Sequence, residues 1–339
     1  MLSRRCALLS LITLAGACRR DAARKGAEEK PATEVARSSP PELPGASPSS
    51  SAGLSAAETD ASAEAAGHGS ASAVTLLEWT LPSPIERAVV LVPRRESGAP
   101  EQRFPVVIAL HGRGEALKGP ALGAMGWPRD YALERAIGRL SAPPLVEDDF
   151  EGLVASAHLA ELNRALAEHP FGRLIIACPY VPDLNLSSGE DVDAYARALT
   201  TELLPRVRAE TPALATPEAT GIDGVSLGGI VALRAGLGQP GVFGAVGALQ
   251  PAIRNTAAAA TELAELAKAA RARRPALKLR LTTSERDSFR LAVTRTSEAW
   301  RVAGIAHDFA VRPGPHDYIF NRGPGAIELL FWHDQVLAR

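Results

Sequence analysis

The sequence predicts an α/β fold in which helices cover both faces of a mostly parallel sheet. After residue 73, short apolar runs of strand length alternate with longer segments of helical periodicity. The run at 104–110 is continuously apolar, as expected of a central strand that is covered on both faces. The chain has 339 residues, of which 46% are hydrophobic, and this content is enough for one large core.

The first two expected strands differ from the rest. The runs at 73–81 and 88–93 are joined by a segment with two prolines, 82–84, and we expect them to form an antiparallel edge. The remaining strands are expected at 104–110, 173–178, 219–225, 243–249, 277–282 and 307–312. The helices between and after them are expected at 192–208, 227–238, 256–273, 289–304 and 326–338.

One segment, 115–170, is too long for a simple connection. It carries helical patterns at 131–137 and 154–166, so we predict a helical insertion after the His-Gly-Arg-Gly motif at 111–114. Such insertions often form lids over a site, but an enlarged crossover between two strands has the same pattern. Both interpretations remain open from the sequence.

The N-terminus has the pattern of an export signal over residues 1–18. Arg4 and Arg5 precede an apolar stretch at 7–14, which is far shorter than the ~20 residues that cross a bilayer. Ala-Gly-Ala before Cys18 resembles a bacterial lipobox, although Ala15 stands where leucine is usual. We therefore expect lipid attachment at Cys18 and a protein anchored to the membrane of the bacterial cell envelope.

Residues 19–73 are rich in Ala, Ser, Pro, Glu and Gly and have almost no large aliphatic side chains. Such a segment cannot bury a core, so we predict a disordered tether and a folded domain at 74–339. Cys6 would leave with the signal and Cys18 would carry lipid. Cys178 would then be the one cysteine of the domain, where we expect an ordinary buried side chain and no disulfide.

The most informative motif is Gly-Val-Ser-Leu-Gly at 224–228, between an expected strand and an expected helix. This is the pattern of a nucleophile elbow, in which a serine on a sharp turn is exposed at the edge of the sheet. The glycines leave room where strand and helix approach closely. Ser226 is the candidate nucleophile, and the backbone N–H of Leu227, at the start of the helix, is a candidate oxyanion donor.

A serine hydroxyl needs a base within hydrogen-bond reach, and the base needs an acid to fix its tautomer. His316 is the candidate base because it directly follows the last expected strand, from which a loop can carry the imidazole over the elbow. The other histidines of the domain are placed less well for this role: His111 in the loop after 104–110, His158 and His169 in the insertion, His307 at a strand start, and His333 in the last helix.

Asp287 is the leading candidate for the acid, because it follows the strand at 277–282 where that strand runs into a loop. Glu285 is the nearest competitor. Asp308 and Asp317 are interpreted as surface charges, although Asp317 adjoins the histidine and could orient its loop.

The motif at 111–114 follows the buried strand 104–110, so its backbone could supply a second oxyanion donor, at Gly112 or Arg113. The Arg113 side chain could bind an anionic group of a substrate, but a solvated or ion-paired arginine is the commoner outcome. We interpret His111 as a packed residue that shapes this loop. The order serine, acid, histidine along the chain is that of α/β-hydrolases.

These motifs, with Pro-Gly-Val-Phe-Gly-Ala at 240–245 and Pro-Gly-Pro-His-Asp-Tyr at 313–318, resemble those of the Putative esterase family, often called the esterase D family, of the α/β-hydrolases. The resemblance covers about residues 79–337 and implies an α/β-hydrolase fold with Ser226, Asp287 and His316 as a catalytic triad. Pro315 stands where the family usually has glycine, and the long insertion is not a general family feature. Both departures bear on substrate specificity.

The resemblance and the motifs lead to one functional expectation with alternatives. We expect a serine carboxylic-ester hydrolase that acts through an acyl-enzyme on a small or carbohydrate-linked ester. The alternatives are an acyltransferase or peptidase on the same fold, and a non-catalytic binding lipoprotein of the envelope. The sequence shows no metal-ligand spacing and no phosphate loop, so no cofactor is expected. A net charge of −1, with no basic patch, disfavours nucleic acid as a partner.

Overall fold

The computed structural model describes residues 73–94, 102–186 and 189–338. The expected signal at 1–18, the lipid site at Cys18 and nearly all of the tether at 19–73 lie outside the described residues, so these remain predictions. No helix among the described residues has both the length and the apolar character needed to cross a membrane.

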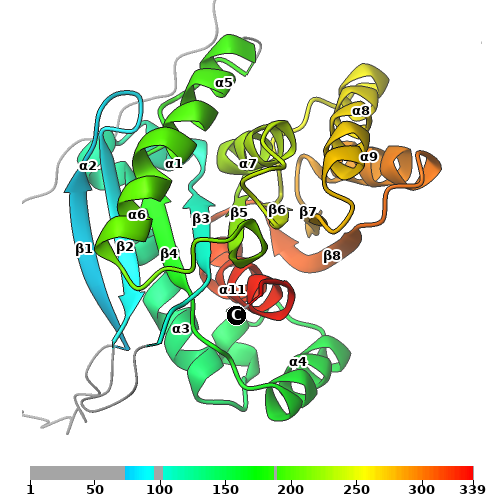
Figure 1. The fold of residues 1–339 in the computed structure, drawn as a ribbon. Coiled ribbons are helices and arrows are strands. Elements are labelled where there is room, and N and C mark those ends of the chain that lie inside the picture. The colour runs from blue at the N-terminus through cyan, green and yellow to red at the C-terminus, as the bar shows by residue number, and fades with distance from the viewer. Residues whose placement is uncertain (1–72, 95–101, 187–188, 339) are drawn as a thin grey trace, which may run out of the picture. The chain divides into compact units, whose positions relative to one another are not determined.

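A single sheet organises the described part of the chain, with strand order β1-β2-β4-β3-β5-β6-β7-β8 (Figure 1). β1 pairs antiparallel with β2, as predicted, and β2 pairs antiparallel with β4. All other neighbours are parallel. The strands are β1 Val74–Thr80, β2 Arg87–Pro93, β3 Val106–Leu110, β4 Ile175–Pro179, β5 Thr220–Gly224, β6 Ala245–Leu249, β7 Lys278–Arg286 and β8 Asp308–Pro315.

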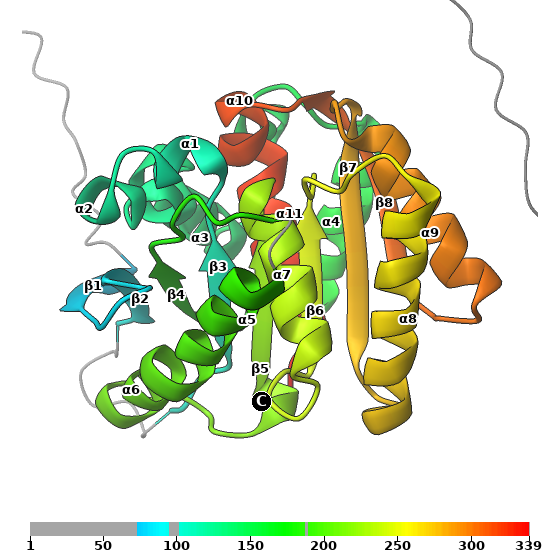
Figure 2. The ribbon, with the colours of Figure 1, turned by 90° about the horizontal axis from the view of Figure 1, so that it is seen from above.

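Helices cover both faces of this sheet, as Figure 2 shows from above. One layer consists of α5 Gly189–Ala198, α6 Leu204–Glu210, α7 Leu227–Gly238, α8 Ala257–Arg273 and α9 Arg290–Val302, with η3 Leu199–Leu203 between α5 and α6. The other consists of α3 Leu133–Ser141, α4 Ser156–Glu168 and α11 Ala326–Val336. The short helical turns are α1 Arg113–Ala116, α2 Pro120–Gly123, η1 Gly126–Asp130, η2 Glu147–Phe150, η4 Pro217–Ala219, α10 Tyr318–Phe320 and η5 Asn321–Gly325.

The alternation of side chains along β3 explains why the sheet has two cores. Val106, Ile108 and Leu110 point into the core beneath α5–α9, whereas Val107 and Ala109 point into the core beneath α3, α4 and α11. Every residue of β3 is buried. The prediction of a central strand covered on both faces is therefore confirmed.

The insertion at 115–170 is helical, as predicted, and much of it belongs to the body of the fold. Leu133, Ile137 and Leu140 of α3 and Leu162 and Leu166 of α4 are buried in the core with α11. These two helices thus form part of the crossover from β3 to β4. The segment before them, from α1 to η1, lies at the carboxyl end of β3.

Two strands run further than expected. The sequence predicts ends at residues 282 and 312, but β7 extends to Arg286 and β8 to Pro315. The parallel ladder between them continues through a bulge at Ser284 and Arg286, so backbone pairing extends beyond the apolar positions. This extension carries the next residues, Asp287 and His316, to the same edge of the sheet.

Candidate active site

Ser226 lies on the turn between β5 and α7 with a backbone conformation that few non-glycine residues adopt. Its φ is 56° and its ψ is −115°. Its N–H donates to the carbonyl of Leu249 (3.0 Å), and its carbonyl accepts from the N–H of Ala252 (2.9 Å). Bonds to Leu249, at the end of β6, and to Ala252, in the loop that follows, hold the strained residue in place, as a nucleophile elbow requires.

The glycines of the motif are required by close backbone approaches. A Cβ added at Gly224 would lie 2.5 Å from the carbonyl oxygen of Gly228, and one added at Gly228 would lie 2.4 Å from that of Leu110. Backbone atoms cannot move aside as a flexible side chain can. The sequence therefore brings β3, β5 and α7 together at the serine.

Asp287 and His316 form a hydrogen-bonded pair at the ends of β7 and β8. Oδ1 of Asp287 lies 2.8 Å from Nδ1 of His316, and the Asp287 side chain is fully buried. The carboxylate also accepts from the hydroxyl of Thr283 (2.6 Å) and the N–H of Phe289 (2.9 Å). The competitor Glu285 is exposed on β7. The structure thus brings together the predicted acid and the predicted base.

A cavity of about 500 Å³ opens beside the elbow. Its lining includes Ser226 and Leu227, and Phe289, whose ring is 5.3 Å from that of His316. The remaining lining residues are Arg113, Asp183, Leu184, Asn185, Leu186 and Ala252. The candidate nucleophile and a neighbour of the candidate base therefore share one cavity.

The Arg113 side chain is ion-paired rather than free. Its guanidinium makes two bonds of 2.8 Å to the carboxylate of Asp183, and this pair raises the pKa of Arg113. Arg113 also begins α1, so the helix starts inside the motif that was expected to be a loop. Of the two outcomes considered for this side chain, the structure shows the ion pair.

The two predicted oxyanion donors on the β3 side differ in their contacts. The N–H of Gly112 donates to the hydroxyl of Tyr131 (3.3 Å). Arg113 is the first residue of α1, as Leu227 is the first residue of α7, and N–H groups at such positions have no acceptor within their own helix. Gly112 nevertheless lies close to the serine, since a Cβ added there would be 3.7 Å from the Cβ of Ser226.

His111 shapes this turn from its buried position. Its Nε2 accepts from the N–H of Val181 (2.9 Å), so its Nδ1 carries the proton and donates to the carbonyl of Gly112 (2.9 Å). Burial lowers the pKa of His111 to about 4, which keeps the ring neutral. This agrees with the interpretation of His111 as a packed residue.

The other histidines contact other parts of the fold. His158 lies 2.6 Å from Glu328, His333 lies 3.1 Å from Asp223, and the Nε2 of His307 lies 2.8 Å from the hydroxyl of Ser297. His169 is exposed.

The two aspartates that were interpreted as surface charges are exposed but also have structural roles. Asp308 accepts from the indole N–H of Trp332 (2.7 Å), and Asp317 caps α10 by accepting from the N–H of Ile319 (2.9 Å). Asp317 thereby fixes the turn that follows His316.

The sequence analysis missed Gln250, which connects the elbow side of the sheet to the histidine loop. This residue is fully buried and has a φ of 44°. Its amide donates to the carbonyl of Pro315 (2.8 Å) and to the hydroxyl of Ser284 (2.7 Å). A polar residue directly after the apolar run at 243–249, at the edge that carries the elbow, was the signal that could have identified it.

Comparison with known proteins finds one family whose model matches part of the chain. Residues 179–320, which contain Ser226, Asp287 and His316, match the family described as Putative esterase. No curated protein matches the chain.

Similar solved structures include a ferulic acid esterase (16% identity, 78% of this chain and 98% of that chain, TM-score 0.56). They also include two structures from Staphylococcus aureus. One is described as the fluorophosphonate-binding serine hydrolase F (16% identity, 77% of this chain and 98% of that chain, TM-score 0.51). The other is described as an S-formylglutathione hydrolase (16% identity, 77% of this chain and 96% of that chain, TM-score 0.50).

The fold and the matched family define the class of the protein: it is a hydrolase of the carboxylesterase type with the α/β-hydrolase fold. The match to the Putative esterase family covers residues 179–320, which is less than half of the chain.

Proposed function

We propose that this protein is a serine esterase that cleaves a small, uncharged carboxylic ester, free or linked to a carbohydrate, with Ser226 as nucleophile. The observation that carries the proposal is the 2.8 Å pair between Asp287 and His316, at the sheet edge where the strained Ser226 turn also lies. A buried carboxylate on Nδ1 leaves Nε2 of the imidazole as the proton acceptor, which is the arrangement that a serine nucleophile needs.

In the proposed reaction, Oγ of Ser226 attacks the ester carbonyl carbon while Nε2 of His316 takes the hydroxyl proton. Asp287 stabilises the imidazolium that forms. The tetrahedral oxyanion is stabilised by backbone N–H groups, that of Leu227 and one from the Gly112–Arg113 turn. The C–O bond to the alcohol then breaks, and His316 gives its proton to the leaving alkoxide. Water, deprotonated by His316, attacks the acyl-enzyme and releases the carboxylic acid.

The charges around the cavity support an uncharged substrate. Arg113 and Asp183 neutralise each other at its wall, and the neighbouring lining from Leu184, Leu186 and Phe289 is apolar. An anionic substrate group would have to compete with Asp183 for both of its bonds to Arg113. We therefore expect uncharged acyl groups to react faster than dicarboxylic ones.

The test uses the full chain, its Ser226→Ala variant and the matched control Ser288→Ala, which changes an exposed serine next to Asp287. Hydrolysis of p-nitrophenyl acetate and butyrate, and labelling by a fluorophosphonate probe, should be lost in Ser226→Ala and kept in Ser288→Ala. A folded wild type that neither hydrolyses these esters nor takes the label would refute the proposal and favour a binding protein. Diversion of the acyl group from water to an added alcohol would identify an acyltransferase.

We also propose that the enzyme is exported and anchored by lipid at Cys18 in the bacterial cell envelope. The support is the short apolar stretch before Ala-Gly-Ala-Cys at 15–18. In a bacterial host, labelled palmitate should be incorporated into the wild type and not into Cys18→Ala, with Cys6→Ala as control. Equal labelling of wild type and Cys18→Ala would contradict the anchor.

A further inference from the structure

We propose that Glu115 is a positioning residue that fixes the turn beside Ser226 and the loop of His316 to one buried carboxylate. This inference rests on the proposed esterase function. In this arrangement the N–H of Arg113, and not that of Gly112, is the oxyanion donor on the β3 side.

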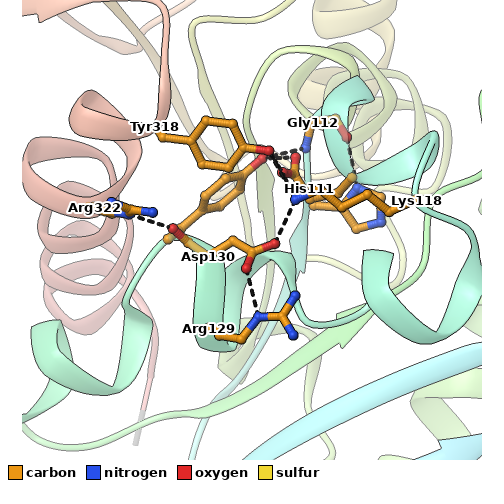
Figure 3. Close-up of polar contacts among 9 residues, drawn as sticks. His111, Gly112, Lys118, Arg129, Asp130, Tyr318 and Arg322 are labelled. Atoms are coloured by element: carbon orange, nitrogen blue, oxygen red, sulfur yellow. Dashed lines mark hydrogen bonds and ion pairs between the residues drawn. The ribbon is translucent and has the colours of Figure 1, made fainter. Parts of the chain in front are cut away.

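Glu115 lies in α1 and is almost completely buried, at 1% exposure. Its carboxylate accepts from the hydroxyl groups of Tyr131 and Tyr318, and Nζ of Lys118 lies 3.4 Å away. We refer to Glu115, Lys118, Tyr131 and Tyr318 as the Glu115 cluster. Figure 3 shows the side chains of Lys118 and Tyr318 and the backbone of Gly112 lying close together there. A buried carboxylate costs free energy that an apolar side chain of similar volume would not, so packing alone does not account for it.

The first arm of the cluster runs through Tyr131 to the turn beside the serine. Because the hydroxyl proton of Tyr131 is donated to Glu115, a lone pair on the same oxygen is left to accept from the N–H of Gly112 (3.3 Å). A Cβ added at Gly112 would lie 3.2 Å from this oxygen and 3.7 Å from the Cβ of Ser226. The tyrosine hydroxyl and the serine thus flank the same glycine.

This contact commits the N–H of Gly112 and leaves the next N–H to an oxyanion. The carbonyl of Gly112 is held by Nδ1 of His111 (2.9 Å). In a trans peptide the N–H points opposite to the carbonyl, so fixing the Gly112 carbonyl also fixes the direction of the Arg113 N–H. Tyr131 and His111 therefore hold Gly112 from both sides and orient the donor that follows it.

The second arm runs through Tyr318, two residues after His316. Its hydroxyl accepts from Nζ of Lys118 (3.1 Å) and donates to Glu115. The side chain of Arg322 lies 5.9 Å from the centre of the Tyr318 ring and donates to the carbonyl of Asp130 (2.9 Å). Tyr318 is the first residue of α10, and Asp317, which directly follows His316, caps this helix. Displacement of Tyr318 would therefore also move the turn that carries His316.

The charges of the cluster keep both tyrosines as hydrogen-bond donors. Burial and the neighbouring Glu115 carboxylate raise the pKa of Tyr131 well above its usual value, and the same causes raise that of Tyr318. Burial opposes the charge of Lys118, but its bonds to Asp130 and Tyr318 raise its pKa. At neutral pH both tyrosines therefore keep their hydroxyl protons and Lys118 keeps its charge, which suits a cluster that holds one geometry.

The experiment compares Glu115→Gln, Tyr131→Phe and Tyr318→Phe with the control Thr220→Val. Thr220 is also fully buried, and its hydroxyl donates to the carbonyl of Thr216 (2.8 Å) at the start of β5, the end of the strand opposite to Ser226. The readouts are kcat and KM for p-nitrophenyl butyrate, the rate of fluorophosphonate labelling at Ser226, and the thermal unfolding midpoint.

We expect Glu115→Gln and Tyr131→Phe to lower kcat and the labelling rate by about 10- to 100-fold with KM within about twofold of the wild type, because displaced donors weaken transition-state binding. Tyr318→Phe should lower kcat by a smaller factor, and Thr220→Val should leave kcat unchanged. Combining Glu115→Gln with Tyr131→Phe should cost little more than either change alone.

Folded variants whose kcat stays within about twofold of the wild type would overturn the proposal, as would an equal loss in Thr220→Val. If Glu115→Gln does not fold, Tyr131→Phe decides, because it removes only one oxygen. An inactive, unlabelled wild type would refute the esterase function and this inference together, whereas an active wild type with unaffected variants would refute this inference alone.

Discussion

The carboxylate of Asp287 and the imidazole of His316 meet at 2.8 Å because β7 and β8 are adjacent parallel strands that end at the same edge of the sheet. Thr283 and Phe289 donate to the two oxygens of the same carboxylate. These bonds fix the rotamer of the acid before a substrate arrives. The pair is therefore preorganised by its own strand and by the start of the following helix.

Replacement of this acid tests the triad without removing a nucleophile. Asp287→Asn keeps the shape of the side chain but favours the wrong tautomer of His316, and we expect kcat to fall by about 10³- to 10⁴-fold. Glu285→Gln, at the exposed competitor position, should leave kcat near that of the wild type. Steady-state hydrolysis of p-nitrophenyl butyrate measures both, and a larger loss in Glu285→Gln would reverse the assignment of the acid.

The closeness of the elbow to β3 predicts a steric limit at Gly228. Gly228→Ala would place a Cβ 2.4 Å from the carbonyl oxygen of Leu110 and 2.5 Å from that of His111, and we expect a loss of about 3 kcal/mol in the free energy of unfolding. Gly138→Ala, in α3, meets no atom within 4 Å and should gain about 0.5–1 kcal/mol. Urea unfolding compares the two, and similar free energies for both variants would contradict this close approach of the two backbones.

The buried His111 predicts a pH dependence of stability. Its pKa is about 4 in the folded protein and about 6.5 when unfolded, so protonation favours the unfolded chain. Stability from this group is complete above pH 6.5 and is lost as the pH falls from 6.5 to 4, by about 3 kcal/mol in total. His111→Gln should reduce the slope of unfolding free energy against pH in this window, whereas His169→Gln, at an exposed histidine, serves as the control. An unchanged slope in His111→Gln would count against the lowered pKa.

Removing one partner of a buried ion pair behind the elbow should cost more unfolding free energy than breaking a surface pair. Arg280 lies 2.7 Å from Asp223, and both side chains are buried. Arg280→Met leaves the Asp223 charge without this partner, and we expect a loss of about 3–5 kcal/mol in unfolding free energy.

The control for this prediction is Glu298→Gln, which breaks an exposed pair with Arg301 and should cause no measurable change. Adding Asp223→Asn to Arg280→Met should cost less than the sum of the two single changes, because the pair is coupled. Strictly additive losses in chemical unfolding would show that the two charges do not depend on each other.

Much of the fold could be predicted because its signals are local. The elbow helix α7, Leu227–Gly238, has the expected limits, and α8 begins at Ala257 after Thr256, whose hydroxyl accepts from Ala259 as an N-cap. The ends of β7 and β8 were placed too early because they are fixed by pairing between strands and not by apolar periodicity. Tertiary pairing has no signature within either segment.

The same distinction applies to the site. Ser226 and His316 follow strands, so their positions along the chain indicated the edge at which they lie. Glu115, Tyr131 and Tyr318 were missed because their cluster joins segments that are far apart in the sequence. No spacing rule relates a phenol in the insertion to one beyond the last strand.

The position of each strand in the sheet has a consequence for how activity is lost. Ser226 follows β5, which is fully buried and has strands on both sides. His316 follows β8, which is partly exposed and, among the described strands, pairs with β7 alone. Amide hydrogens on such an edge strand exchange with solvent through small local openings, whereas those of a central strand exchange only when a larger part of the sheet opens. The candidate base His316 can thus move away from the candidate nucleophile Ser226 while the central strands stay paired. Loss of activity under mild heating should therefore precede unfolding of the sheet.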